Sequence, residues 1–131
     1  MAYSPLGRGL LTGNITNAES VPVQLRRLDK YQGENLEHNL RLVDAVKNVS
    51  AQHPGHTMAT FALSWIRQIS GRDGLGTFIP ISGSSKAGNV LANGQNILLS
   101  DQDFASIQKI LNENPTKGER GYGAQKQYLQ G

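Results

Sequence analysis

The sequence predicts an α/β fold with parallel strands. Two short apolar segments of strand length, one within residues 2–9 and one at residues 77–81, are separated by residues with helical periodicity. Another helical segment follows the second strand. Because every path that leaves a strand is helical, we expect the two strands to run parallel. Parallel strands are normally covered on both faces and flanked by further strands. We therefore expect the chain to supply a portion of a larger sheet or barrel.

The connection between the strands is expected to hold a long loop and two helices. Residues 14–33 are polar and irregular, which is typical of a loop, with a short turn near residues 24–28. Residues 35–52 predict an amphipathic helix, because apolar side chains recur there at steps of three and four. A second helix begins after Thr57, a suitable N-cap. Its expected apolar face consists of Met58, Phe61, Ala62, Trp65, Ile66 and Ile69.

Two further helices are predicted after the second strand. A brief helical turn is expected near residues 87–93. Ser100 and Asp103 have the spacing of a capping box, in which each side chain accepts a hydrogen bond from the other residue's backbone amide. We expect the structured region of the chain to cover residues 1–113. Residues 114–131 are rich in glycine, glutamine and charge, and they predict a flexible tail.

The composition argues against several functional classes. The 131 residues include no cysteine, which rules out disulfides, thiolate metal ligands and cysteine nucleophiles. No apolar run reaches the roughly 18 residues that a membrane helix needs, and the first residues lack the pattern of a signal peptide. We therefore expect a cytoplasmic protein with no membrane partner. The net charge of +3 comes from scattered basic residues, so nucleic-acid binding is not expected.

Metal and serine-hydrolase sites are not expected either. His38 lies off the apolar face of its helix, His53 lies at the end of that helix, and His56 lies in the turn that follows. No carboxylate has metal-ligand spacing to these histidines. The stretch Gly83-Ser84-Ser85 lacks the second glycine of a Gly-x-Ser-x-Gly nucleophile elbow.

Each predicted strand runs directly into a loop of small residues that suits an anionic ligand. The first loop lies in AYSPLGRGLLTG (residues 2–13), and the second lies in FIPISGSSK (residues 78–86), which continues to Asn93. Glycines let the backbone approach a ligand closely, and exposed N–H groups at a helix N-terminus favour negative charge. Each loop also carries one cation. Two such loops on parallel strands could bind one elongated phosphorylated cofactor.

These residues, in this order, resemble the C-terminal portion of an aldo-keto reductase. Residues 2–13 are similar to the family's seventh barrel strand and the loop after it. Residues 35–40 and 57–65 are similar to the two helices that come next. The stretch IPISGSS (residues 79–85), continuing to Asn93, resembles the eighth strand and its cofactor loop. Each motif alone is weak, and the ordered set carries the resemblance.

The resemblance implies a fold and an activity. The family fold is a (β/α)8 TIM barrel, of which this chain would hold strands 7 and 8 with their helices, an incomplete barrel. Family members reduce aldehydes and ketones with hydride from NADPH. A tyrosine supplies the proton, helped by Asp, Lys and His from the first half of the barrel. No residue of this chain matches those positions, so we assign no catalytic residue and expect the chain alone to be inactive.

The resemblance also assigns the first loop a share of the cofactor site. Tyr3 corresponds to the aromatic residue that stacks on the nicotinamide ring. Ser4, Leu6 and Arg8 correspond to positions along the pyrophosphate and the adjoining ribose. The Arg8 loop and residues 32–43 are most similar to fungal pyridoxal reductase-type members, which makes pyridoxal one substrate that the resemblance suggests.

The second loop would hold the adenosine end of NADP(H). Ser84, Ser85 and Lys86 correspond to positions near the 2′-phosphate, and Asn93 corresponds to a position near the adenine. Asn89 stands where many members have an arginine, which leaves the choice between NADP and NAD open. Lys86 could supply the missing charge, because a fixed cation and several hydroxyl donors suit a phosphate dianion.

Two other interpretations stay open. The chain could be a non-catalytic nucleotide-binding or partner-binding fragment, which NADPH binding without turnover would favour. Exposed sheet edges invite pairing, so a complementing chain or self-association is expected for an incomplete barrel. An unrelated small α/β protein with a phosphate-binding loop would instead melt cooperatively as a monomer. That interpretation lacks support from a Walker-type or Gly-x-Gly-x-x-Gly motif.

Overall fold

The computed structural model describes residues 1–119, and residues 120–131 lie outside the described region. Among residues 1–119, the short strands β1 (Ala2–Tyr3) and β2 (Pro80–Ile81) form a parallel sheet in which Ala2 lies opposite Pro80. The predicted parallel pairing is therefore confirmed. The second strand is shorter than the predicted range of residues 77–81, because only its last two residues pair with β1.

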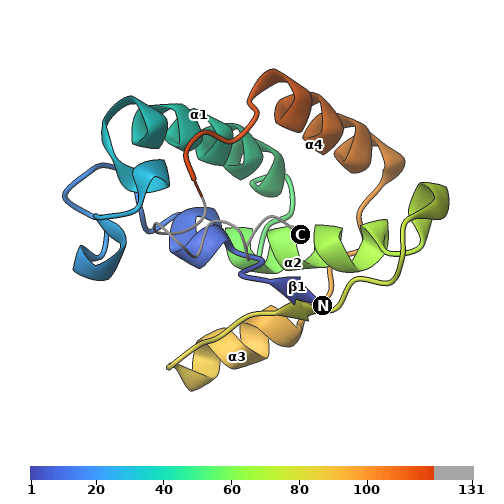
Figure 1. Cartoon of the computed structure of the whole chain (residues 1–131). Helices are drawn as coiled ribbons and strands as arrows, with labels where there is room; N and C mark the ends of the chain where they lie inside the picture. The colour runs from blue at the N-terminus through green and yellow to red at the C-terminus, as the bar shows by residue number, and fades with distance from the viewer. Residues whose placement is uncertain (120–131) are drawn as a thin grey trace.

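Helices make up most of the rest of the described chain. Four are α-helices: α1 (Gly33–Ser50), α2 (Met58–Ile69), α3 (Ala87–Gly94) and α4 (Asp101–Glu113). Four are short 3₁₀-helices: η1 (Gly7–Thr12), η2 (Val23–Leu25), η3 (Asp29–Tyr31) and η4 (Arg72–Gly74). Figure 1 shows α1 and α4 on one side of α2, and the two strands and α3 on the other. No helix among residues 1–119 combines the length and the apolar character that a bilayer crossing requires.

Residues 14–33 differ from the polar loop that the sequence predicts. They contain the turns of η2 and η3, and they contribute as much to the core as a helix does. Their buried apolar side chains are Ile15, Val21, Leu25, Leu28 and Tyr31. Val21, Leu25, Leu28 and Tyr31 recur at steps of four, three and three, a helix-like spacing that the expected loop does not take into account. The buried side chains pack against α1 and η1, which follow and precede them in the chain.

Helix α2 begins as predicted, but it is buried on more than one face. Thr57 is its N-cap, and the Thr57 side chain accepts a hydrogen bond of 3.0 Å from the Thr60 amide. Beyond the predicted apolar face, Thr60, Leu63 and Ser64 are also fully buried. The helix lies between α1 on one side and β2 and α3 on the other, so both sides lose contact with water.

Helix α4 opens with the predicted capping box. The Asp103 amide donates to the Ser100 hydroxyl (3.2 Å), and the Ser100 amide donates to the Asp103 carboxylate (2.8 Å). Removal of such a cap costs about 1 kcal/mol in typical helices. Ile107 is buried in the core, and the other apolar residues of this helix, Phe104, Ile110 and Leu111, are partly buried against it.

The segment after α4 runs back along α1. Buried Asn39 donates to the Lys117 carbonyl (2.9 Å) and accepts from the Lys117 amide (2.9 Å). His38 Nε2 lies 2.8 Å from the Pro115 carbonyl oxygen. The predicted tail covers residues 114–131, of which residues 120–131 lie outside the described region of the chain. Its flexibility therefore stays a prediction.

Candidate functional site

The first loop leaves β1 with an unusual backbone. Ser4, Gly7, Arg8 and Gly9 all have positive φ, at 50°, 55°, 52° and 105°. For residues with a side chain this conformation costs roughly 1–2 kcal/mol each, so the surroundings must hold it. The Gly7 amide donates to the Ser4 carbonyl (2.9 Å), and the Thr12 hydroxyl donates to the Gly9 carbonyl (2.7 Å). Several hydrogen bonds thus maintain a strained turn at the end of the strand.

The second loop leaves β2 at the same edge of the sheet, because the strands are parallel. Ser84 accepts a hydrogen bond from the Lys86 amide (3.2 Å), and α3 begins at the next residue. No acidic residue occupies the first turn of α3. The positive end of its helix dipole is therefore not neutralised by a side chain of that turn.

Contacts from α2 anchor the end of α3. The Arg67 guanidinium donates to the backbone carbonyls of Asn93 and Gln95, the latter at 2.8 Å. The Thr60 hydroxyl donates to the Ala92 carbonyl (3.0 Å). A cation that bonds the last carbonyls of a helix is a favourable C-terminal cap. Helix α2 thus fixes the position of Asn93 relative to the second loop.

Two cavities that share lining residues run along both loops. The first, of about 410 Å³, is lined by Tyr3, Ser4, Pro5, Leu6, Arg8, Gly9, Thr12, Ile81, Ser82 and Gly83. The second, of about 260 Å³, is lined by Leu6, Thr12, Asn14, Thr57, Ala59, Gly83, Ser84, Asn89, Ala92 and Asn93. The two cavities together form what we term the groove. Among these described lining residues none is acidic, and Arg8 is the cation.

The groove brings together most of the residues that the resemblance assigns to a cofactor. Tyr3, Ser4, Leu6 and Arg8 line its first cavity, and Ser84, Asn89 and Asn93 line its second. Ser85 and Lys86 are exposed beside the groove and line neither cavity. The Tyr3 side chain is open to solvent, with 62% of the residue exposed.

Four described polar residues of the groove are not among the predicted site residues: Thr12, Asn14, Thr57 and Ser82. Thr57 was identified only as a helix cap, because its sequence context contains no loop of small residues. Thr12 belongs to the first predicted loop. The sequence does not show that it lies beside residues of the second loop, which are far along the chain. Their place in the groove depends on tertiary packing.

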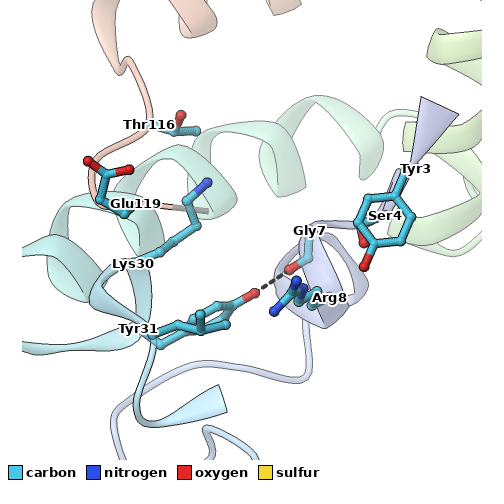
Figure 2. Close-up of a pocket in the computed structure, with 9 residues that line it drawn as sticks. Tyr3, Ser4, Gly7, Arg8, Lys30, Tyr31, Thr116 and Glu119 are labelled. Carbon is cyan, nitrogen blue, oxygen red and sulfur yellow. Dashed lines mark hydrogen bonds between the residues drawn. The ribbon is translucent and has the colours of Figure 1, made fainter. Parts of the chain in front are cut away.

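A third cavity, of about 310 Å³, lies beside the groove and shares Tyr3, Ser4 and Arg8 with it (Figure 2). Tyr31 is on its wall, and the Tyr31 hydroxyl donates a hydrogen bond of 2.6 Å to the Gly7 carbonyl (Figure 2). Burial raises the pKa of Tyr31, and the positive charge of Arg8 offsets some of that rise. The hydroxyl therefore stays protonated near neutral pH and acts as a donor.

The histidines occupy positions that the sequence only partly predicts. Within residues 1–119 no cluster of three or more His, Asp or Glu side chains could hold a metal ion. The sequence contains no sign of a carboxylate near His53, yet His53 Nε2 lies 3.1 Å from Oδ1 of Asp103. The two residues are distant in sequence and meet where α1 and α4 pack together.

Comparison with known proteins bears on this arrangement. The sequence signature of the Aldo/keto reductase family matches residues 1–112. The Saccharomyces cerevisiae protein named "Putative pyridoxal reductase" is 34% identical over 134 residues, which cover 92% of this chain and 38% of that protein. Aldo-keto reductase str7 of Strobilurus tenacellus is 32% identical, over 92% of this chain and 35% of its own length.

A second yeast relative extends the comparison. The Schizosaccharomyces pombe protein named "Probable pyridoxal reductase 2" is 31% identical over 92% of this chain and 37% of its own length. The chain therefore spans less than two fifths of the length of these relatives. No solved structure matches the chain. The signature and the relatives agree over nearly all of the described residues, and on that evidence this chain belongs to the aldo/keto reductase family.

Proposed function

We propose that residues 1–113 form the NADP(H)-binding C-terminal segment of an aldo-keto reductase barrel and hold its strands 7 and 8. The family is one of oxidoreductases that generally use a nicotinamide cofactor. In this proposal the complete protein reduces an aldehyde or ketone by hydride transfer from NADPH. Pyridoxal is a candidate substrate, because two yeast relatives are named as pyridoxal reductases.

The observation that carries the proposal is the groove along both loops. Its two cavities adjoin at Leu6, Thr12 and Gly83, so a single elongated ligand could lie across both. We place the nicotinamide at the open side of Tyr3 and the pyrophosphate beside Ser4 and Arg8. The adenosine then lies in the second cavity, which suits a molecule with two nucleoside ends joined by phosphates.

The charge of the groove favours a phosphorylated ligand. Arg8 lines the first cavity, Lys86 lies exposed at the N-terminus of α3, and acidic side chains are absent from the described lining. A Cβ added at Gly83 would meet no atom within 4 Å, so this stretch of the loop leaves space for a ligand. A phosphate gains from such donors and from the end of a helix dipole.

In this proposal the chain orients the cofactor and supplies no proton donor. NADPH, when bound, supplies a hydride to the carbonyl carbon of the substrate. Tyr3 would hold the nicotinamide ring by stacking, and the first loop would fix the adjoining phosphates. No residue of the groove is assigned to protonate the carbonyl oxygen. The isolated chain is therefore proposed to bind NADP(H) without turnover.

A titration of the purified chain with NADPH, followed by nucleotide fluorescence, tests the proposal. We expect a saturable signal that Lys86→Ala weakens. Lys47→Ala provides the control, because Lys47 is an exposed cation in the last turn of α1 and belongs to neither loop. Absence of binding in a chain that melts cooperatively would contradict the proposal.

A second candidate function is that of a partner-binding fragment. The two strands and the residue before β2 expose large apolar side chains, with 62% of Tyr3, 59% of Ile79 and 52% of Ile81 accessible to water. Exposed apolar surface of this kind marks interaction sites. A complementing chain or a second copy of this chain would cover it. Sedimentation of the chain over a range of concentrations separates the two candidates, since a stable monomer that binds NADPH would exclude a role limited to partner binding.

A further inference from the structure

Tyr31 contacts the first loop from outside the groove. It ends η3, and only 4% of the residue is exposed. Its hydroxyl donates a hydrogen bond of 2.6 Å to the carbonyl oxygen of Gly7, as Figure 2 shows. Neither Tyr31 nor Gly7 lines the groove, whereas Arg8, the next residue, does. This hydrogen bond therefore influences the groove through the peptide unit between Gly7 and Arg8.

That peptide unit lies in the strained region of the loop. Gly7 has φ 55° and Arg8 has φ 52°, and a positive φ is unfavourable for a residue that carries a side chain. All described peptide bonds are trans, so the Arg8 N–H points away from the Gly7 carbonyl. A hydrogen bond that holds this carbonyl toward Tyr31 keeps the Arg8 N–H turned to the opposite side. Loss of the bond would free the peptide to rotate.

The position of Tyr31 is itself fixed from α1. The side chain of Asn39, with 1% of the residue exposed, donates to the carbonyl of the neighbouring Lys30 (3.0 Å). The Gln32 amide donates to the Asp29 carbonyl (3.2 Å) and closes the turn of η3. These two hydrogen bonds hold the turn of η3, from which the Tyr31 hydroxyl projects. Because burial raises its pKa, it remains a donor across the neutral pH range.

We infer that Tyr31 is a positioning residue for the nucleotide site: its hydroxyl fixes the peptide between Gly7 and Arg8 in the orientation that the pyrophosphate end of the nucleotide needs. The inference rests on the proposed function, because it concerns the first loop of the same groove. Tyr31 acts through Gly7 and Arg8 and touches neither cofactor nor substrate. Loss of the Tyr31 hydroxyl should therefore weaken binding of the pyrophosphate end of the nucleotide and leave binding of the adenosine end unchanged.

The test replaces the hydroxyl alone, with Tyr31→Phe in the full chain. A net hydrogen bond of ordinary strength corresponds to about a fivefold change in affinity, so the Kd for NADPH should rise about fivefold. The Kd for adenosine 2′-phosphate, which reaches only the second loop, should stay within about twofold. Ser64→Ala is the matched control, because it removes a buried hydroxyl that accepts from the Ile97 amide (2.9 Å), makes no hydrogen bond to the first loop and lines neither cavity of the groove. It should leave both Kd values unchanged.

Amide hydrogen exchange without nucleotide gives an independent measurement. Tyr31→Phe should speed exchange in residues 6–13 and leave residues 83–94 unchanged. An unaltered Kd for NADPH with unaltered exchange in residues 6–13 would overturn the inference, as would an equal loss of both nucleotides. If the unaltered chain bound neither nucleotide, the proposed function would fail, while faster exchange in residues 6–13 would still support the positioning role of Tyr31 in the loop.

Discussion

The imidazole of His53 lies 3.1 Å from the carboxylate of Asp103 and joins the turn after α1 to the first turn of α4. The same carboxylate accepts hydrogen bonds from the Ser100 amide and hydroxyl, each at 2.8 Å. The His53 ring also packs against Phe61, with ring centroids 5.4 Å apart. One carboxylate therefore caps a helix and links it to two neighbouring elements.

This arrangement predicts a loss of stability in acid. Burial alone would raise the pKa of Asp103, but the hydrogen bonds from His53 and Ser100 and the charge of His53 outweigh it and lower the pKa. A carboxylate whose pKa is lower in the folded state stabilises the fold above the unfolded pKa of 3.8. That stabilisation is lost as the pH falls from about 5 through the folded pKa. Urea unfolding between pH 3 and pH 7 measures it.

Asp103→Asn should flatten that pH dependence and lower the stability at pH 7. Asp101→Asn is the control, because Asp101 lies in the same helical turn with 98% of its side chain exposed. An equally steep acid transition in Asp103→Asn would show that other carboxylates cause it.

Gly118 predicts a sharp difference between two glycine substitutions. A Cβ at Gly118 would lie 2.5 Å from Cα and 2.6 Å from N of Lys30, whereas a Cβ at Gly55 would meet nothing within 4 Å. The two residues have nearly the same φ, +88° and +85°, so alanine costs the same backbone strain at both. Gly118→Ala should therefore push the segment after α4 away from η3 and release its hydrogen bonds to α1.

Amide exchange at two positions measures the release, because the Lys117 amide bonds to Asn39 and the Glu119 amide bonds to Asp29. Exchange at both should speed up in Gly118→Ala and stay unchanged in Gly55→Ala. Equal exchange in the two variants would mean that the segment accommodates the extra carbon.

Arg67→Ala should weaken binding at the adenosine end of the proposed site. The substitution removes the donor to the carbonyls of Asn93 and Gln95, so the end of α3 loses its cap. We expect the Kd for adenosine 2′-phosphate to rise about fivefold, by the usual strength of such bonds. Isothermal titration checks this, with Arg41→Ala as the control, because Arg41 is an exposed residue of α1. An unchanged Kd would indicate that Asn93 is not part of the binding surface.

Lys86 and Arg8 predict the preference between NADPH and NADH. Lys86 is exposed at the N-cap of α3, close in sequence to the groove residues Ser84 and Asn89. If its ammonium contacts the 2′-phosphate, Lys86→Ala should weaken NADPH about tenfold more than NADH. Arg8→Ala should weaken both nucleotides alike, since Arg8 lies in the first cavity. Parallel titrations with the two nucleotides measure the ratio.

Local signals in the sequence predict local structure well. Thr57 and the pair Ser100 and Asp103 cap α2 and α4 as expected, because a cap needs only residues within one turn. The predicted helix at residues 35–52 is shifted by two residues, to Gly33–Ser50. The parallel pairing of β1 with β2 also follows from the helices that connect them. The two loops of small residues do lie on one groove.

Features that depend on distant contacts could not be predicted in the same way. The core role of residues 14–33 arises from packing on α1. The helix-like spacing of Val21, Leu25, Leu28 and Tyr31 is the one local sign of that role, and the polar residues between them obscure it. Tyr31 and Gly7 are 24 positions apart, and Asn39 and Lys117 are 78 apart, so no spacing rule connects them. Ser85 and Lys86, which the resemblance assigns to the cofactor, do not line the groove, and no local pattern in the sequence shows which residues of a loop will line a cavity.

The parallel pairing of Ala2 with Pro80 has a consequence for the kinetics of unfolding. Only two residue pairs join the strands, although about 80 residues of chain lie between them. Closing so long a segment costs entropy, so this pairing should form late when the chain folds. A dinucleotide that spans both loops would act as a reversible cross-link across that segment. Saturating ligand should therefore slow the separation of the two loops far more than it slows the fraying of α4.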